Sequence, residues 1–156
     1  MGLSKASTPN PGGPHCQSSH AVDKLPDREL LMADASVLEA MYAFYNAVKA
    51  AVSSPNSKDP NPWVNPSKFC ARKRPDLFPV RDRNVCAHLG ILNLSDARAD
   101  WLVFRALVQD DDVRRAIDTL PEGAHQAAGE RQLALDSSVL RLLDAALWSY
   151  TVWGPA

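Results

Sequence analysis

The sequence predicts an all-α protein: a single small helical domain of about five to seven helices behind a disordered N-terminal tail. Three observations support this fold class. Apolar residues recur at the three- and four-residue spacing of an amphipathic helix. Residue types that cap helices precede most of these segments. No run alternates between apolar and polar residues in the manner of a half-buried strand.

Residues 1 to 22 are predicted to form the tail and residues 23 to 156 the helical domain. The tail is rich in Ser, Pro, Gly and Asn, so burial of apolar side chains cannot offset the entropy lost on ordering it. It has no apolar core of a signal peptide, and no run of the chain approaches the ~20 apolar residues that span a bilayer. We therefore expect a cytoplasmic protein of a bacterium-like cell with no membrane partner.

The first long helix is expected to run from Ser36 to about Val52, because Ser36 and Glu39 have the spacing of a capping box. Apolar residues follow at helical intervals. Residues 25 to 33 are expected to form a short helix or the first turns of this one. Residues 53 to 62 are rich in Pro, Ser and Asn, which predicts a loop.

The next segment begins with Asn65 and Pro66, a typical pair of N-cap and first-turn residues. A short helix is predicted from there to about Lys73, and Pro75 prevents its continuation. Residues 77 to 80 are then expected to be an extended connector.

Two further helices are predicted from their caps. Asp82 is a natural N-cap for a short helix that Gly90 ends. Ser95 or Asp96 is expected to cap the helix that follows, which carries Trp101 on its apolar face.

The C-terminal part is predicted to contain two more helices. The acids at positions 110 to 112 favour the positive end of a helix dipole, and Pro121 is expected to close that helix. Residues 122 to 135 are expected to be a loop or a weak helix, and residues 136 to 138 to cap the last helix. The side chains expected to face inward from the last helix are Val139, Leu143, Ala146, Leu147 and Tyr150. The predicted core consists of Val37, Met41, Tyr45, Val48, Phe69, Val85, Leu89, Trp101, Phe104, Val108, Ile117, Leu143 and Leu147.

The densest charge lies between residues 68 and 83, where six cations occur with only two acids. Lys68 and Arg72 are one helical turn apart and therefore share a face. Because the formal net charge of the chain is −1, a polyanion would have to bind such a local patch. The alternative is that these cations pair with carboxylates such as Asp100 or those at 110 to 112. The predicted sites for DNA or another polyanion are Lys68, Arg72, Lys73, Arg74, Arg81 and Arg83.

Other residue types give weaker indications of chemistry. Phe69 and Phe78 flank the cations and either stack on bases or anchor helices to the core. Cys70, Cys86 and His88 lack the paired spacing of a zinc site, and a fourth ligand would have to come from the tail. We predict no metal and no cofactor. No nucleotide-binding loop or nucleophile elbow occurs, which favours a protein that is not an enzyme.

The run from position 67 to position 82 reads Ser-Lys-Phe-Cys-Ala-Arg-Lys-Arg-Pro-Asp-Leu-Phe-Pro-Val-Arg-Asp. With its Ser-Lys, Arg-Lys-Arg-Pro and Pro-Val-x-Asp elements, this run resembles an uncharacterised bacterial family, identified as domain of unknown function 6308. The resemblance extends over residues 63 to about 150 and includes the helix around Trp101 and the run from 140 to 148. The family has no established activity.

The same run more distantly resembles the helix-hairpin-helix DNA glycosylases, in which an apolar connector precedes an Asp that caps the next helix. This resemblance implies that Asp82 is the catalytic Asp, which stabilises positive charge on the sugar or activates a nucleophile. The chain departs from the pattern at residues 62 to 66, which replace the Gly-rich hairpin. Val64 stands where the bifunctional enzymes have a nucleophilic Lys. Asp82 also fits the structural role of an N-cap alone.

Three functions follow from these observations. The preferred one is a nucleic-acid- or anion-binding module related to the helix-hairpin-helix fold. The first alternative is a non-enzymatic interaction or structural protein, in which internal acids neutralise the arginines and an exposed apolar patch marks the partner site. The last is a glycosylase-like enzyme that uses Asp82.

Overall fold

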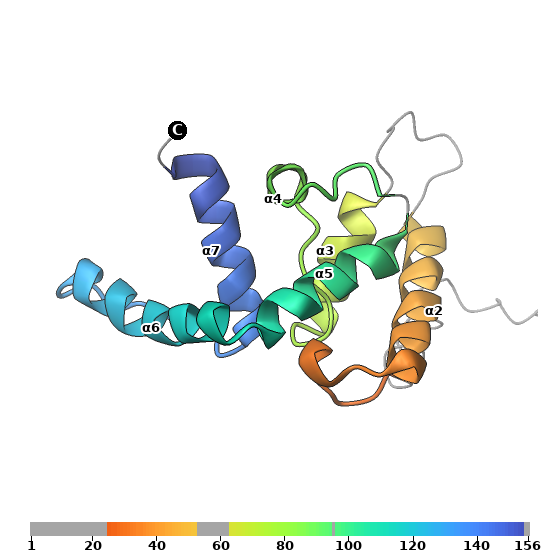
Figure 1. The fold of residues 1–156 in the computed structure, drawn as a ribbon, viewed down its shortest axis with the longest axis horizontal. Coiled ribbons are helices and arrows are strands. Elements are labelled where there is room, and N and C mark those ends of the chain that lie inside the picture. The colour runs from red at the N-terminus through yellow and green to blue at the C-terminus, as the bar shows by residue number, and fades with distance from the viewer. Residues whose placement is uncertain (1–24, 53–62, 95, 155–156) are drawn as a thin grey trace, which may run out of the picture.

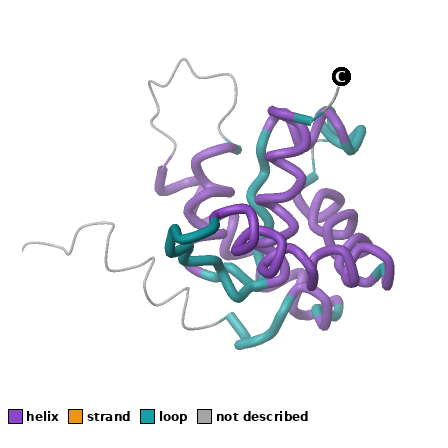
Figure 2. The backbone as a smooth tube through the Cα atoms, turned by 90° about the vertical axis from the view of Figure 1, so that its left-hand side faces the viewer, coloured by secondary structure: helices purple, strands orange, loops and turns teal. Residues whose placement is uncertain are grey.

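The structure is a computed structural model that describes residues 25–52, 63–94 and 96–154. Within these ranges the chain contains six α-helices, one turn of 3-10 helix and no strand, which confirms the predicted all-α class (Figures 1 and 2). The disorder predicted for residues 1–22 and the loop predicted for residues 53–62 lie outside the described residues.

The N-terminal part consists of the 3-10 turn η1, Leu30–Met32, and the helix α2, Ala35–Val52. Asp34 caps α2, because its Oδ1 accepts a hydrogen bond from the backbone N–H of Val37 at 3.0 Å. The hydroxyl of Ser36 donates to the same oxygen at 2.7 Å. The predicted capping box at Ser36 was therefore wrong by two residues, since the Asp34 carboxylate already occupies the position that the Ser36 hydroxyl was expected to fill.

The helix α3, Val64–Lys73, begins two residues earlier than its sequence predicts. Asn65 was expected to be the N-cap and instead lies inside the first turn. Pro66 remains in that turn, where a backbone N–H has no intrahelical partner and a proline therefore costs little. Residues 74–82, which we call the connector, follow α3 and contain no strand.

The helices α4, Arg83–His88, and α5, Ala97–Gln109, agree with their predicted starts. Asp82 caps α4, and Asp96 caps α5 by accepting from the N–H of Arg98. The stop predicted at Gly90 is also confirmed, because this residue has a φ of 72°, which glycine adopts without steric cost.

The helix α6, Asp111–Ala128, is longer than expected, and the predicted end at Pro121 was wrong. A proline inside a helix removes one hydrogen bond, and here the helix continues for two more turns. Its end is set by Gly129, which has a φ of 62°. The segment from 122 to 128, predicted as a loop or weak helix, is thus regular helix.

The last helix, α7, Val139–Trp153, is capped by Ser138, as predicted. Leu143 is buried on its inner face, but the prediction that Tyr150 faces inward was wrong because that side chain is 54% exposed. The later turns of α7 pack against the short helix α4, where the ring centroids of Tyr150 and His88 lie 5.3 Å apart, and this contact still leaves the Tyr150 side chain largely exposed. The helix α5 crosses the molecule and contacts α2, α6 and α7.

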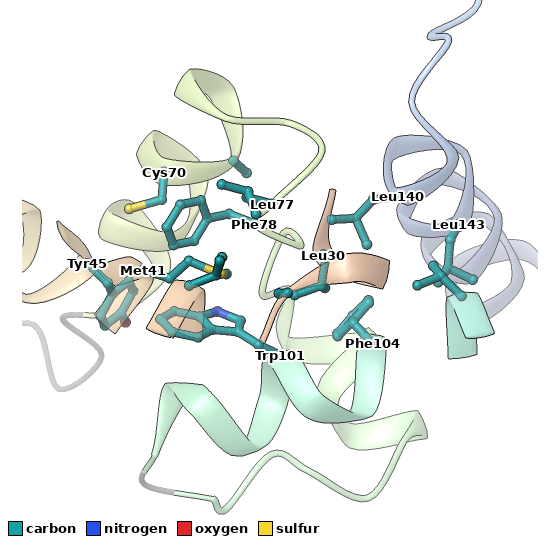
Figure 3. Close-up of a cluster of buried hydrophobic side chains, with 14 of the residues drawn as sticks. Leu30, Met41, Tyr45, Cys70, Leu77, Phe78, Trp101, Phe104, Leu140 and Leu143 are labelled. Atoms are coloured by element: carbon teal, nitrogen blue, oxygen red, sulfur yellow. The ribbon is translucent and has the colours of Figure 1, made fainter. Parts of the chain in front are cut away.

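The core is centred on Phe78, a connector residue whose side chain is 1% exposed (Figure 3). Its ring centroid lies 5.9 Å from that of Phe44 and 5.5 Å from that of Trp101, with the second pair edge to face. This confirms that Phe78 anchors the core. Among the predicted core residues, only the three side chains of Phe69, Leu89 and Leu147 are half-buried, and the rest are buried.

Candidate ligand-binding groove

The connector is held in place by hydrogen bonds to α3 on one side and to α7 on the other. The hydroxyl of Ser67 in α3 accepts from the backbone N–H of Arg81 at 2.8 Å and donates to the carbonyl of Pro79 at 3.4 Å. From the other flank, Oδ2 of Asp144 in α7 accepts from the N–H of Val80 at 3.0 Å. These bonds fix the backbone that leads from α3 into α4.

Arg141 of α7 holds the connector nearer its start. Its Nε donates to the carbonyl of Pro75 at 3.3 Å, and its Nη2 donates to the carbonyl of Phe78. The same guanidinium forms an ion pair of 2.8 Å with Asp144, one helical turn further along. Arg141 and Asp144 therefore act together as the contact between α7 and the connector.

Asp144 is a buried carboxyl with an incomplete set of partners. Its residue surface is 9% exposed, and burial raises its pKa to about 7, although Arg141 and the N–H of Val80 oppose that rise. Oδ1 of Asp144 is buried and accepts no hydrogen bond from any described residue. A buried carboxylate oxygen of this kind is costly unless a proton or a donor reaches it.

A groove of about 450 Å³ lies where α7 faces the connector, the middle of α3 and the start of α4. One wall comes from the connector and the adjacent helices, and the other from α7. The walls include Val85 and Ala145, which are apolar. The other side chains that matter to its chemistry are Lys68, Asp82, Arg141, Asp144 and Trp148.

Four of the six cations predicted to bind a polyanion are exposed. They are Lys68, Arg72 and Lys73 on α3, and Arg83 on α4. Within residues 25–52, 63–94 and 96–154, no carboxylate forms an ion pair with any of them. The ammonium group of Lys73 lies over the ring of Phe69, 5.7 Å from its centroid.

The other two predicted cations are engaged with neighbouring groups. Nε of Arg81 lies 2.5 Å from the carboxylate of Asp100, and the two side chains are 11% and 3% exposed. The N–H is not directed at the oxygen, so the contact is an ion pair rather than a hydrogen bond. The Arg81 guanidinium also lies 4.1 Å from the ring centroid of Trp63 and donates to the carbonyl of Leu94. Asp100 is one of the carboxylates that the sequence offered as an alternative partner.

Arg74 lies at the start of the connector and is half-buried. One guanidinium nitrogen is 3.5 Å from the carboxylate of Asp27, and another donates to the carbonyl of Leu25 at 3.1 Å. Arg74 thus joins the connector to the segment before η1.

The two carboxylate oxygens of Asp82 have different surroundings. Its Oδ1 accepts from the N–H of Asn84 at 2.8 Å and from that of Val85 at 3.5 Å, which confirms that it is an N-cap. Its second oxygen accepts no hydrogen bond from the part of the chain that the structure describes, and its side chain lines the groove. The cap explains the residue structurally and leaves one oxygen available to a ligand.

Sequence reasoning missed Asp144, Arg141 and Trp148 as groove residues. A signal was present, because Asp144 occupies a position on the apolar face of its helix, between Leu143 and Leu147. A charged residue in that register is either neutralised by a partner or placed at a site.

The cysteines fit the alternative of buried thiols. Cys70 and Cys86 are both 0% exposed, and burial raises their pKa values to about 12 and about 11, so both thiols stay protonated. Among the described residues there is no cluster of three His, Cys, Asp or Glu side chains suited to a metal. The tail residues considered as a fourth ligand lie outside those residues.

Comparison with known proteins leaves the groove without a precedent of known activity. No curated protein and no solved structure matches the chain. None of the helices in the described part is long and apolar enough to cross a bilayer. The model of one family, described as a family of unknown function (DUF6308), matches residues 15–151.

Proposed function

The chain belongs to the DUF6308 family of unknown function, and from its own geometry we propose that it is a nucleic-acid-binding module. The observation that carries this proposal is the group of four exposed cations on α3 and α4, none paired with a described carboxylate. We call Lys68, Arg72, Lys73 and Arg83 the basic face. It binds DNA or another polyanion through its phosphates, in the cytoplasm.

The arrangement of the basic face supports contact with a phosphate backbone. Lys68 and Arg72 project from the same side of α3, and Lys68 also lines the groove. Exposed cations that bind phosphates release condensed counterions, so the affinity should fall steeply as the salt concentration rises. Arg74 and Arg81, also predicted to bind, contribute in this proposal by holding the connector that aligns α3 with α4.

The test is a salt titration of binding to a fluorescent single-stranded DNA. Each phosphate contact contributes about 0.7 to the slope of log K against log salt concentration, so removal of three contacts should reduce the slope by about 2. The affinity at low salt should fall as well. The variant carries Lys68→Ala, Arg72→Ala and Arg83→Ala.

A matched control separates the basic face from net charge. Arg28, Arg115 and Arg131 are exposed and lie outside α3, the connector and α4, so their replacement by Ala changes the net charge by the same amount. The control variant should retain the slope of the wild type. Equal losses in both triple variants, or no binding by the wild type at low salt, would contradict the proposal.

A second candidate, a glycosylase-like enzyme that uses Asp82, is favoured by one observation. The groove lies beside Asp82, and an enzyme that acts on a base taken out of the helical stack needs such a concave site. The comparison to test is Asp82→Asn against Asp82→Ala. Asn caps a helix about as well as Asp, whereas Ala should cost about 1 kcal/mol of stability.

The assay is base excision from oligonucleotides that contain damaged bases, with stability measured by urea unfolding. We expect that the wild type excises no base and that Asp82→Asn unfolds at nearly the wild-type urea concentration. Excision by the wild type that is lost in the equally stable Asp82→Asn variant would establish the enzyme instead.

A non-enzymatic interaction protein remains the other alternative. Tyr150, Val152 and Trp153 at the end of α7 are exposed apolar side chains, the kind of residue at which such a partner site would form. No DNA binding by the wild type at low salt would favour it.

A further inference from the structure

The size of the groove restricts what part of a nucleic acid can enter it. Its volume of about 450 Å³ lies within the range of about 300 to 1,000 Å³ typical of small-ligand pockets. A duplex is far larger, and a paired base cannot leave its partner without being unstacked. An unpaired base on a flexible strand carries no such cost.

The interior of the groove combines apolar walls with acceptors. Val80, Val85 and Ala145 line it, together with the carboxylates of Asp82 and Asp144. Lys68 and Arg141 line it as well, but Arg141 is already engaged with Asp144 and with carbonyls of the connector, which leaves Lys68 to contact a phosphate and the two carboxylates to contact a base. Carboxylates accept hydrogen bonds from amino groups, which cytosine, adenine and guanine all carry on their base edges.

Asp144 provides an independent indication that the groove receives a hydrogen-bond donor. Its side chain is nine-tenths buried, yet Oδ1 has no hydrogen-bond donor among the described residues. Buried carboxylate oxygens in proteins are normally satisfied. An amino group of a ligand in the groove would supply the missing donor after a small movement of the carboxyl.

Trp148 supplies a flat aromatic surface at the groove. The residue is 38% exposed, so part of its ring is open to a ligand. Its ring also meets that of Trp153 edge to face, with centroids 4.9 Å apart, which restricts its rotation. An indole held in this way is a platform on which a base can stack.

We infer that the groove receives one unpaired, amino-bearing base stacked on Trp148, while the flanking phosphates contact Lys68 and the rest of the basic face. The protein is therefore a single-strand binder rather than a duplex binder. This inference rests on the proposed function and adds the kind of nucleic acid to it.

The experiment compares the affinity of the full chain for three probes of equal length at one salt concentration: single-stranded oligo(dC), its duplex with oligo(dG), and an abasic strand that keeps the phosphates. The wild type should prefer oligo(dC) to both other probes. Trp148→Ala should weaken binding to oligo(dC) about ten-fold and leave binding to the abasic strand unchanged.

Two further variants control for folding and for position on the helix. Trp148→Phe retains an aromatic face and should bind oligo(dC) nearly as the wild type does. Tyr150→Ala removes a more exposed aromatic side chain of α7 that does not line the groove, and it should have no effect.

Equal affinity of the wild type for oligo(dC) and the abasic strand would overturn the inference, as would equal effects of Trp148→Ala and Tyr150→Ala. If the basic-face variant still weakens binding in that case, the proposed function stands and only the base site is lost. If the wild type binds none of the three probes at low salt, both the base site and the proposed function are wrong.

Discussion

Asp144 contributes both to the stability of the fold and to the proposed binding site. It holds the connector through Val80 and pairs with Arg141, and it also lines the groove. Burial raises its pKa to about 7, and burial likewise raises the pKa of Asp100 to about 6, although Arg81 opposes it. Both carboxyls therefore hold a proton more tightly in the folded chain than in the unfolded chain.

The pH dependence of stability follows from these two residues. Between their unfolded pKa of 3.8 and their folded values of about 6 and about 7, the folded state binds more protons than the unfolded state. The free energy of unfolding should therefore fall as the pH rises through this window, by at most about 1.4 kcal/mol per pH unit for each group. Asp34 and Asp96 have lowered pKa values and act in the opposite sense only below pH 3.8.

Urea unfolding at a series of pH values checks this expectation. Asp144→Asn keeps an acceptor for the N–H of Val80 and removes the ionisable group, so the fall between pH 4 and pH 7 should become shallower. Asp118→Asn changes an exposed acid on α6 and should leave the slope unchanged. A stability that rises over this pH range in the wild type would contradict the assignment.

Among the elements, α6 depends least on the core. Ile117 is its one buried residue in the structure's described part, and Figure 1 shows its C-terminal half projecting beyond the body of the molecule. This half also contains Pro121 and Gly123, which lower helix propensity. Its stability therefore depends on local preferences more than on packing, which makes it sensitive to single exposed substitutions.

Two glycines in and after α6 should respond in opposite directions to the same change. Gly123 lies inside the helix, and the space that a Cβ atom would occupy there is open, so Gly123→Ala should stabilise the protein by up to about 1 kcal/mol. Gly129 has equal space but a φ of 62°, so Gly129→Ala should destabilise it by about 1 kcal/mol. Thermal unfolding of the two variants measures both. Shifts of the same sign would show that the end of the helix is not set by Gly129.

For the molecule as a whole, sequence patterns predicted those helix starts and ends that depend on a few neighbouring residues. The caps at Asp82 and Ser138 and the stop at Gly90 each depend on a few neighbouring residues, and all were predicted. The end of α6 was not predicted, because the helix propensity of the residues around Pro121 outweighs the effect of that single proline. The cap at Asp34 was missed because two hydrogen-bonding side chains lie two residues apart and both suit the role.

The groove escaped prediction for a different reason. The cations of the basic face all lie between residues 68 and 83, so they could be named from the sequence. The opposite wall comes from α7, and nothing local to Trp148 or Asp144 reveals that the connector lies across from them. The sequence also could not show which arginines are paired and which are exposed. Arg81 lies near Arg83 in sequence, but its partner Asp100 belongs to another helix.

The long sequence separation across the connector has a consequence for biosynthesis. The hydrogen bonds from α7 to Pro75, Phe78 and Val80 join residues 63 to 66 positions apart. During synthesis, the residues of the basic face leave the ribosome before those of α7, which supplies Trp148 to the groove. In the proposed function, a nascent chain would therefore attract polyanions before α7 is present to discriminate among them.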